Sequence, residues 1–255
     1  MDGVGTFELS IFVLATFAGA LVAGLAGFAF GLIAAAAWLH VISPGDTAAL
    51  IVGFGLIVQG VAVFKLRRAL DWRRLWPFLA GGALGVPLGV VVLEWARPDQ
   101  LRAAVGVLLV TYSLYALVRP ALKLFTNAPV LADSGVGFLS GILGGSTGLG
   151  GILPTIWCGL RGWSNDAQRA VYQPVAVAIF VMTALWLGAQ GSISAVTVEL
   201  FLLGLPALLA GTWLGLRLYG SLDPAGFRKV VLALLLASGL ALILETLVGL
   251  WSQAT

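Results

Sequence analysis

The sequence contains few of the residues on which disulfides and metal centres depend. Its 255 residues include one cysteine, Cys158, and one histidine, His40. A single cysteine excludes an internal disulfide and a cysteine-based metal cluster, and a single histidine argues against a histidine-based metal centre. We therefore expect no metal site and no cofactor.

Charge is also scarce. Charged residues make up 10 % of the chain and hydrophobic residues 60 %, whereas about a quarter of the residues in a soluble domain are charged. Uncharged runs such as Leu75–Leu93 and Ala170–Ala189 reach the length of about 18 residues that a membrane span needs. The composition predicts an all-α, polytopic membrane protein in the lipid bilayer. The net charge of +3 fits the Lys and Arg of cytoplasmic loops better than it fits nucleic-acid binding.

Glycine, by contrast, is abundant, and it is concentrated in one stretch. Residues 141–154 read Gly-Ile-Leu-Gly-Gly-Ser-Thr-Gly-Leu-Gly-Gly-Ile-Leu-Pro, inside an uncharged run from Val136 to Leu160. Each glycine costs about 1 kcal/mol relative to alanine inside a helix, so we expect two short helices that meet at the glycines. Broken helices in a membrane are tolerated where the freed backbone groups face protein or water, and they often mark a transporter's binding site.

The order of motifs recurs along the chain. Four segments reappear at an offset of 121 to 126 residues: 24–30 at 145–151, Ser43 at Ser164, 85–89 at 211–215, and 101–102 at 227–228. We therefore expect two halves, residues 1–126 and 127–255, each with one broken segment followed by three plain membrane spans.

The basic residues favour one topology for these halves. If all eight apolar segments cross the membrane, the 14 Lys and Arg residues divide equally between its two sides. If each broken segment is instead a re-entrant hairpin, all but Arg97 and Arg102 lie on one side, as the positive-inside rule requires. A hairpin plus three crossings per half gives an inverted repeat. This topology predicts two external termini at the cell (inner) membrane and two hairpins that meet near the midplane.

The glycine-rich segments and the repeated motifs described above resemble those of the TauE/SafE family of sulfite and organosulfonate transporters, and the resemblance covers nearly the whole chain. The most specific segment is 144–154, and the first-half version is 24–31. The first-half version departs from the family pattern, since Ala29 stands where a glycine is common and Ala35–Ala37 stand where a proline is expected. The resemblance implies transport of a small sulfur-containing anion. It leaves open which anion, the direction, the coupling ion (a proton or sodium) and whether the protein is a homodimer.

The break at Gly148 predicts an anion site. The next helix is expected to begin near Gly150 and Gly151, and free N–H groups at a helix N-terminus attract anions. Ser146 and Thr147 would add hydroxyl donors. The alternative is that the glycines only allow close helix packing. The predicted substrate-binding residues are Gly145, Ser146, Thr147, Gly148, Gly150, Gly151 and Gln173 in the second half, with Gly24, Gly27, Phe28, Phe30 and Gln59 in the first.

Other residues allow two interpretations each. Gln59 and Gln173 are polar within apolar spans, so they either line the pathway or join helices by hydrogen bonds. Arg161 and Arg169 either attract anions to the cytoplasmic mouth or extend to the interface and fix the topology. His40 either couples protons or is an ordinary interfacial residue. Phe28 and Phe30 are candidates for an apolar gate.

We therefore expect a transporter that works by alternating access. The competing functions are a passive anion channel and a membrane subunit that transports nothing. An intramembrane enzyme is disfavoured, because the sequence has no His-Glu-x-x-His motif and no pair of membrane-embedded aspartates.

Overall fold

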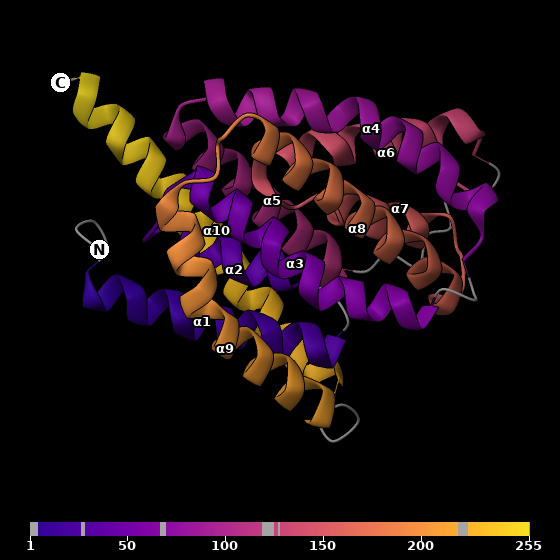
Figure 1. Cartoon of the computed structure of the whole chain (residues 1–255), viewed down its shortest axis with the longest axis horizontal. Helices are drawn as coiled ribbons and strands as arrows, with labels where there is room; N and C mark the ends of the chain where they lie inside the picture. The colour runs from indigo at the N-terminus through magenta and orange to yellow at the C-terminus, as the bar shows by residue number, and fades with distance from the viewer. Residues whose placement is uncertain are drawn as a thin grey trace. The chain divides into compact units, whose positions relative to one another are not determined.

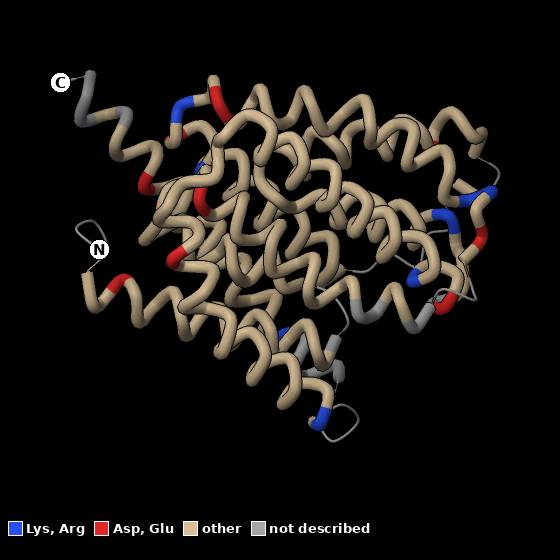
Figure 2. The backbone as a smooth tube through the Cα atoms, viewed as in Figure 1, with Lys and Arg blue, Asp and Glu red and all other residues tan. Residues whose placement is uncertain are grey.

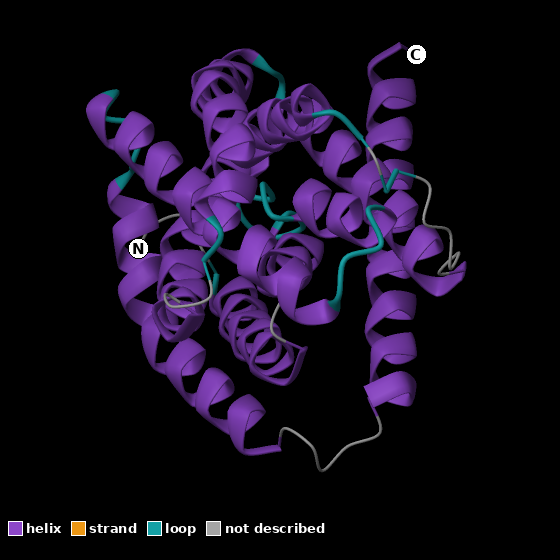
Figure 3. Cartoon of the chain, turned by 90° about the vertical axis from the view of Figure 1, so that its right-hand side faces the viewer, coloured by secondary structure: helices purple, strands orange, loops and turns teal. Residues whose placement is uncertain are grey.

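The computed structural model of the chain describes residues 5–26, 29–66, 70–118, 125–126, 128–218 and 224–254, without the side chains of residues 26, 61, 62, 65, 66, 165, 224–228, 250 and 252–254. The regular structure in these residues is entirely helical, and no strand occurs among them (Figure 3). The helices are α1 (Thr6–Ala26), α2 (Phe30–Trp38), α3 (Pro44–Leu66), α4 (Trp72–Trp95), α5 (Pro98–Val118), α6 (Val130–Thr147), α7 (Ile152–Leu160), α8 (Asn165–Ala189), α9 (Ala195–Leu218) and α10 (Pro224–Ala254). The all-α prediction is confirmed.

Six helices in the described part of the chain are long and apolar enough to cross a membrane. They are α1, α4, α5, α8, α9 and α10, and long uncharged stretches separate their charged residues (Figure 2). The apolar part of α3, Pro44–Gly60, is shorter. The prediction of a polytopic membrane protein is confirmed. The sequence favoured α3 over α1 as a membrane span, whereas by length and composition α1 is a candidate span and α3 is not. The side of the membrane on which each loop lies stays a prediction.

Both broken segments contain a break, but their arms differ in length from our expectation. Gly148, with φ 75°, ends α6, and Ala29, with φ 80°, precedes α2. The second arms, α2 and α7, have nine residues each. The expectation of short first arms was wrong, because α1 has 21 residues and α6 has 18. Three of the six glycines counted as helix breakers, Gly141, Gly144 and Gly145, lie inside α6, where other helices pack against them.

The element order in residues 6–118 recurs in residues 130–254. Each series runs from a long helix to a nine-residue helix and then to three long helices. The serine before the third helix caps it in both series: Ser43 Oγ accepts from the amide of Asp46 at 3.1 Å, and Ser164 Oγ from that of Ala167 at 3.4 Å. This recurrence is what two related halves would give, while the division at residue 126 and the inversion stay predictions.

The chain forms two compact units, each built from segments of both halves of the sequence. Unit 1 comprises residues 1–47, 96–120 and 202–255, and unit 2 comprises residues 48–95 and 121–201. Unit 1 thus contains α1, α2, α5, α10 and most of α9, whereas unit 2 contains α4, α6, α7, α8 and most of α3.

In unit 1, the short helix α2 is held against α1 by aromatic side chains. Trp38 is fully buried, with its ring 4.9 Å from that of Phe12 and 6.0 Å from that of Phe30. Its indole N–H donates to the Phe12 carbonyl at 3.3 Å. Glycines allow the other helices of this unit to approach closely, since a Cβ added at Gly24 would lie 2.8 Å from the Thr212 carbonyl oxygen of α9.

In unit 2, α4 and α6 lie side by side (Figure 1). A Cβ on Gly145 would lie 2.5 Å from the Val86 carbonyl oxygen, and one on Gly141 would lie 2.6 Å from that of Gly82. Small residues let helix backbones approach in this way in membranes. The close-packing interpretation is therefore correct for these two glycines of the motif.

Candidate functional site

The junction between α6 and α7 requires glycine at its turning point. Gly148 has φ 75°, a left-handed conformation that favours glycine, and its amide closes the helix on the Gly144 carbonyl at 2.9 Å. A Cβ at Gly148 would also lie 2.9 Å from Ile51 Cβ and 3.0 Å from the Ala48 carbonyl oxygen, both in α3. Backbone conformation and space thus both explain why α6 ends here.

The start of α7 faces α8. A Cβ on Gly150 would lie 2.7 Å from Ile179 Cγ2, and one on Gly151 would lie 3.2 Å from Ala176 Cβ. Gln173, which is 4 % exposed, precedes Ala176 by about one helical turn on the same face. Gln173 therefore lies on the side of α8 that packs on the junction, and its role in the site stays a prediction.

The start of α7 leaves backbone N–H groups without an acceptor in the described part of the chain, as the first turn of a helix does. Among the residues that the structure describes, the amides of Gly150 and Gly151 donate to no protein acceptor. Two neighbouring amides are used locally, since Leu149 N donates to Thr147 Oγ1 at 3.3 Å and Ile152 N to the Leu149 carbonyl at 3.3 Å. Leu153 N, like the amides of Gly150 and Gly151, donates to no acceptor among the described residues. Free N–H groups at the positive end of a helix can bind the oxygens of an anion.

The hydroxyl groups beside the junction serve the backbone of α6. Ser146 Oγ donates to the Ile142 carbonyl at 2.8 Å, and Thr147 Oγ1 donates to the Leu143 carbonyl at 2.7 Å. Each hydroxyl has a single proton, so in this conformation neither offers a donor to a ligand. Thr147 instead orders the turn by accepting from the Leu149 amide.

Residues 144–148 also fit the Gly-x-Ser-x-Gly pattern of serine hydrolases. In those enzymes the serine lies on a sharp strand-to-helix turn and is activated by a histidine. Here Ser146 lies in the last turn of α6 and donates to its own helix. The one histidine of the sequence, His40, contacts Glu245 and Ser238 instead. The pattern is therefore not a nucleophile site in this structure.

The first-half candidates belong to different surroundings. Gly24 packs on α9, and Phe30 lies in the aromatic cluster of unit 1, whereas Gln59 is half-buried in α3. Gly27 and Phe28 lie outside the described residues. The gate formed by Phe28 and Phe30 and the meeting of the two hairpins stay predictions.

A polar cluster at the open end of the α6–α7 hairpin was missed by the sequence reasoning. Asp133, in the first turn of α6, accepts from Trp157 Nε1 at 2.6 Å and pairs with Arg161 Nη1 at 3.4 Å. Arg161 also donates to the Ala128 carbonyl at 2.8 Å. Its side chain is only 13 % exposed, and both roles considered for Arg161, at the cytoplasmic mouth or in the topology, stay predictions. Arg169 is exposed on α8.

The sequence did contain a signal for this cluster. Asp133 and Arg161 bound the uncharged run around the glycines on either side, and a hairpin brings the two ends of such a run together. Their positions also suit the helix dipoles, since an acid in a first turn and a base after a last turn are each stabilised. The pair thus closes the base of the hairpin.

The fold and the junction define a polytopic membrane protein with two interrupted helical segments. The chain matches the sulfite exporter TauE/SafE family over residues 11–242 of its 255, and it belongs to that family. This family consists of membrane transporters rather than enzymes. No match was found among curated proteins or among solved structures.

Proposed function

We propose that this protein carries a small sulfur-containing anion, such as sulfite or an organosulfonate, across the cell (inner) membrane. The anion is held by the amides of Gly150 and Gly151 at the start of α7. The observation that carries this proposal is the pair of amides without a protein acceptor in the part of the chain that the structure describes, within a family of sulfite exporters.

In the described part of the chain, the amides of Gly150 and Gly151 have unmet hydrogen-bonding capacity. Gly150 is buried, and a buried N–H without an acceptor costs about 1–3 kcal/mol. An oxyanion supplies acceptor oxygens and is further attracted by the partial positive charge at the helix N-terminus. Glycine at both positions lets a ligand approach the backbone closely. The site therefore needs no buried cation, which suits a substrate that must leave again.

The remaining candidates support this arrangement in different ways. Thr147 orders the turn through the Leu149 amide, and Gly145 keeps α6 in contact with α4. Gln173 lies within about one turn of Ala176, the neighbour of Gly151, where its amide can orient a bound anion. We assign the orienting role to Gln173 ahead of Gln59, which lies farther along α3.

The transport cycle that we favour is alternating access. Two halves inserted in opposite orientations can exchange conformations, which turns a site open to one side into a site open to the other. The recurrence of long, short and three long helices supports this reading. A proton or sodium ion as the coupling ion, and a homodimer, remain compatible with it. A passive channel is the main alternative, and it would show no acceleration by substrate on the opposite side.

Two substitutions at one residue test the amide site. Gly151 has φ −79°, which both alanine and proline adopt readily. Each adds a Cβ near Ala176, but proline alone removes the N–H. We expect Gly151→Ala to bind sulfite within a few-fold of the parent protein, and Gly151→Pro to bind at least about tenfold more weakly, the value of a hydrogen bond to a charged group.

Binding is measured as the sulfite-dependent rise in the unfolding midpoint of the purified protein. Circular dichroism and the midpoint without ligand show whether each variant folds. Equal binding by two folded variants would place the site elsewhere. Equal loss in both would show that the space beside Ala176, rather than the N–H, is what binding requires.

A further inference from the structure

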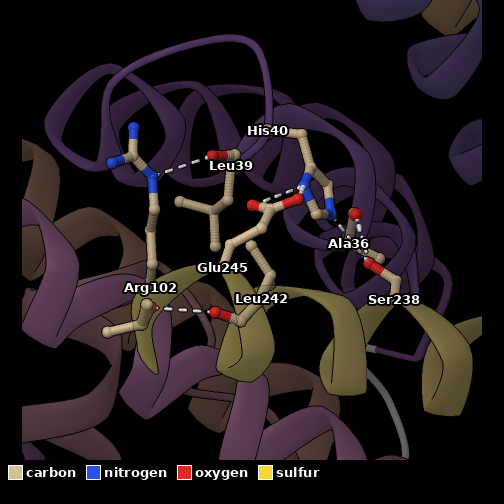
Figure 4. A network of polar contacts seen from close by, with 8 residues as sticks. Ala36, Leu39, His40, Arg102, Ser238, Leu242 and Glu245 are labelled. Atoms are coloured by element: carbon tan, nitrogen blue, oxygen red, sulfur yellow. Dashed lines mark hydrogen bonds and ion pairs between the residues drawn. The ribbon is translucent and has the colours of Figure 1, made fainter. Parts of the chain in front are cut away.

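The end of the short helix α2 is attached to α10 by an imidazole and a carboxylate (Figure 4). His40 Nδ1 lies 3.1 Å and 3.2 Å from the two carboxylate oxygens of Glu245, and its Nε2 lies 3.4 Å from Ser238 Oγ. His40 and Glu245 are 205 residues apart in the sequence. The His40 side chain is 26 % exposed, so protons can reach it from solvent.

The same region satisfies carbonyl groups that the end of α2 leaves free. The last carbonyls of a helix lack partners within it. Here Ser238 of α10 donates its hydroxyl proton to the Ala36 carbonyl, and Arg102 of α5 donates to the Leu39 carbonyl at 3.0 Å (Figure 4). The end of α2 is thus a point at which three helices are joined by polar contacts.

An arginine occupies the equivalent place in the second half. His40 stands three residues before the capping Ser43, and Arg161 stands three residues before the capping Ser164. Both follow a nine-residue helix, and each pairs with a carboxylate in its own unit. The two basic groups differ in one respect: arginine stays charged at all ordinary pH values, whereas histidine changes charge between about pH 5 and 8.

We propose that His40 and Glu245 form a proton-binding site that fastens the end of α2 to α10. The bound proton makes the imidazole a cation, and the ion pair with Glu245 then holds α2. As the pH rises through the range in which histidine changes charge, the proton leaves and the ion-pair attraction is lost. The end of α2 is then held only by hydrogen bonds, such as those from Ser238 and Arg102, and it opens more often. The proposal is independent of which anion is carried.

The charged groups around His40 leave Glu245 as its counter-charge. On α5, the Arg102 guanidinium is partnered by Asp99, with Nη1 3.7 Å from its Oδ1. On α1, which also packs on α2, Glu8 is the one titratable residue, and it accepts from the Gly5 amide at 2.9 Å. At the start of α3, Asp46 accepts from the Ser43 hydroxyl at 2.6 Å. On α10, Lys229 precedes Glu245 by 16 residues, about 24 Å along the helix.

Hydrogen exchange at the two helix ends tests the proposal. The amides of residues 39–42 donate to carbonyls at the end of α2, at 2.7 to 3.3 Å, and they report on its order. Exchange is followed by mass spectrometry on the purified full chain at about pH 5.5 and pH 8, which span the histidine range, and is corrected for the chemical rate. We expect residues 39–42 to exchange about two- to fivefold faster at the higher pH, since an exposed ion pair contributes at most about fivefold.

Three variants separate the proton site from other causes. His40→Arg should keep residues 39–42 slow at both pH values, and Glu245→Gln should make them fast at both. Residues 161–162, whose amides donate to the Trp157 and Gly159 carbonyls, should show no pH dependence in the parent and should acquire it in Arg161→His.

The proposal is overturned if residues 39–42 of the parent protein show no pH dependence, or if His40→Arg retains it. If Glu245→Gln fails to fold, the variants His40→Arg and Arg161→His still test the proposal. These exchange rates do not depend on transport, so a failure here and a failure of the proposed function are distinguishable.

Discussion

Two glycine-to-alanine substitutions on α6 should have opposite effects on stability. A Cβ on Gly141 would lie 2.6 Å from the Gly82 carbonyl oxygen and 2.8 Å from Val86 N in α4, whereas a Cβ on Gly135 meets nothing within 4 Å. Ordinary contact begins at 3.4 Å, so Gly141→Ala must separate α4 from α6 by about 0.8 Å, the difference between 3.4 and 2.6 Å.

The magnitudes follow from that displacement. Both variants gain up to about 1 kcal/mol of helix propensity, and Gly135→Ala keeps this gain. Gly141→Ala loses about 1–3 kcal/mol through overpacking. A gap of about 0.5–1 Å also forfeits a quarter to a half of the attraction between neighbouring atoms. We therefore expect the free energies of unfolding of the two variants to differ by about 2–3 kcal/mol in favour of Gly135→Ala.

The assay is thermal unfolding of the purified protein at a fixed detergent concentration. A difference of 1 kcal/mol shifts the midpoint by about 2–4 °C in a protein of this size, so the two variants should unfold several degrees apart on either side of the parent. If Gly141→Ala unfolds at or above the midpoint of Gly135→Ala, the close contact between α4 and α6 is not as described.

Three further predictions concern single residues and topology. Ala29→Gly should raise the unfolding midpoint, because alanine with φ 80° carries about 1 kcal/mol of strain that glycine lacks, and an unchanged or lower midpoint would contradict this. Asp133→Asn keeps an acceptor for Trp157 but leaves the Arg161 charge buried and unpaired, so the free energy of unfolding should fall by about 3–5 kcal/mol. A fall of less than about 1 kcal/mol would mean that Asp133 and Arg161 do not form a buried ion pair in the protein. On a Cys158→Ser background, a cysteine at position 190 should react with an impermeant reagent from outside and one at position 71 only from inside, and the reverse pattern would refute the re-entrant topology.

The sequence predicted the position of the second break but not the length of its first arm. Gly148 was identified because glycines cluster around it, and the structure confirms a left-handed turn there. Gly141 and Gly145 belong to the same cluster, yet both lie inside α6. Helix propensity disfavours every glycine inside a helix, whereas close packing against α4 requires residues without a Cβ. Propensity could not decide between these effects without the partner helix.

The polar contacts show a second limit of the sequence. Ser43 and Ser164 recur at matching positions of the two halves of the sequence, and in the structure each caps the helix that follows it. The carboxylate that pairs with His40 lies 205 residues away, and no local pattern indicates it. The sequence also does not show which acceptor a hydroxyl group uses. Ser146 and Thr147 donate their protons to carbonyl groups of α6, although their positions suggested ligand donors. The backbone amides of Gly150 and Gly151, which the glycine-rich break did indicate, are therefore the donors that we propose for the site.

Counterflow in proteoliposomes tests the central claim, which is that anion transport passes through the amides at the start of α7. Vesicles that contain the purified protein are loaded with unlabelled sulfite and diluted into a trace of labelled sulfite. The account predicts transient accumulation of label with the parent protein and with Gly151→Ala, and little or none with folded Gly151→Pro. Accumulation by Gly151→Pro at the parent rate, or none by the folded parent protein, would contradict it.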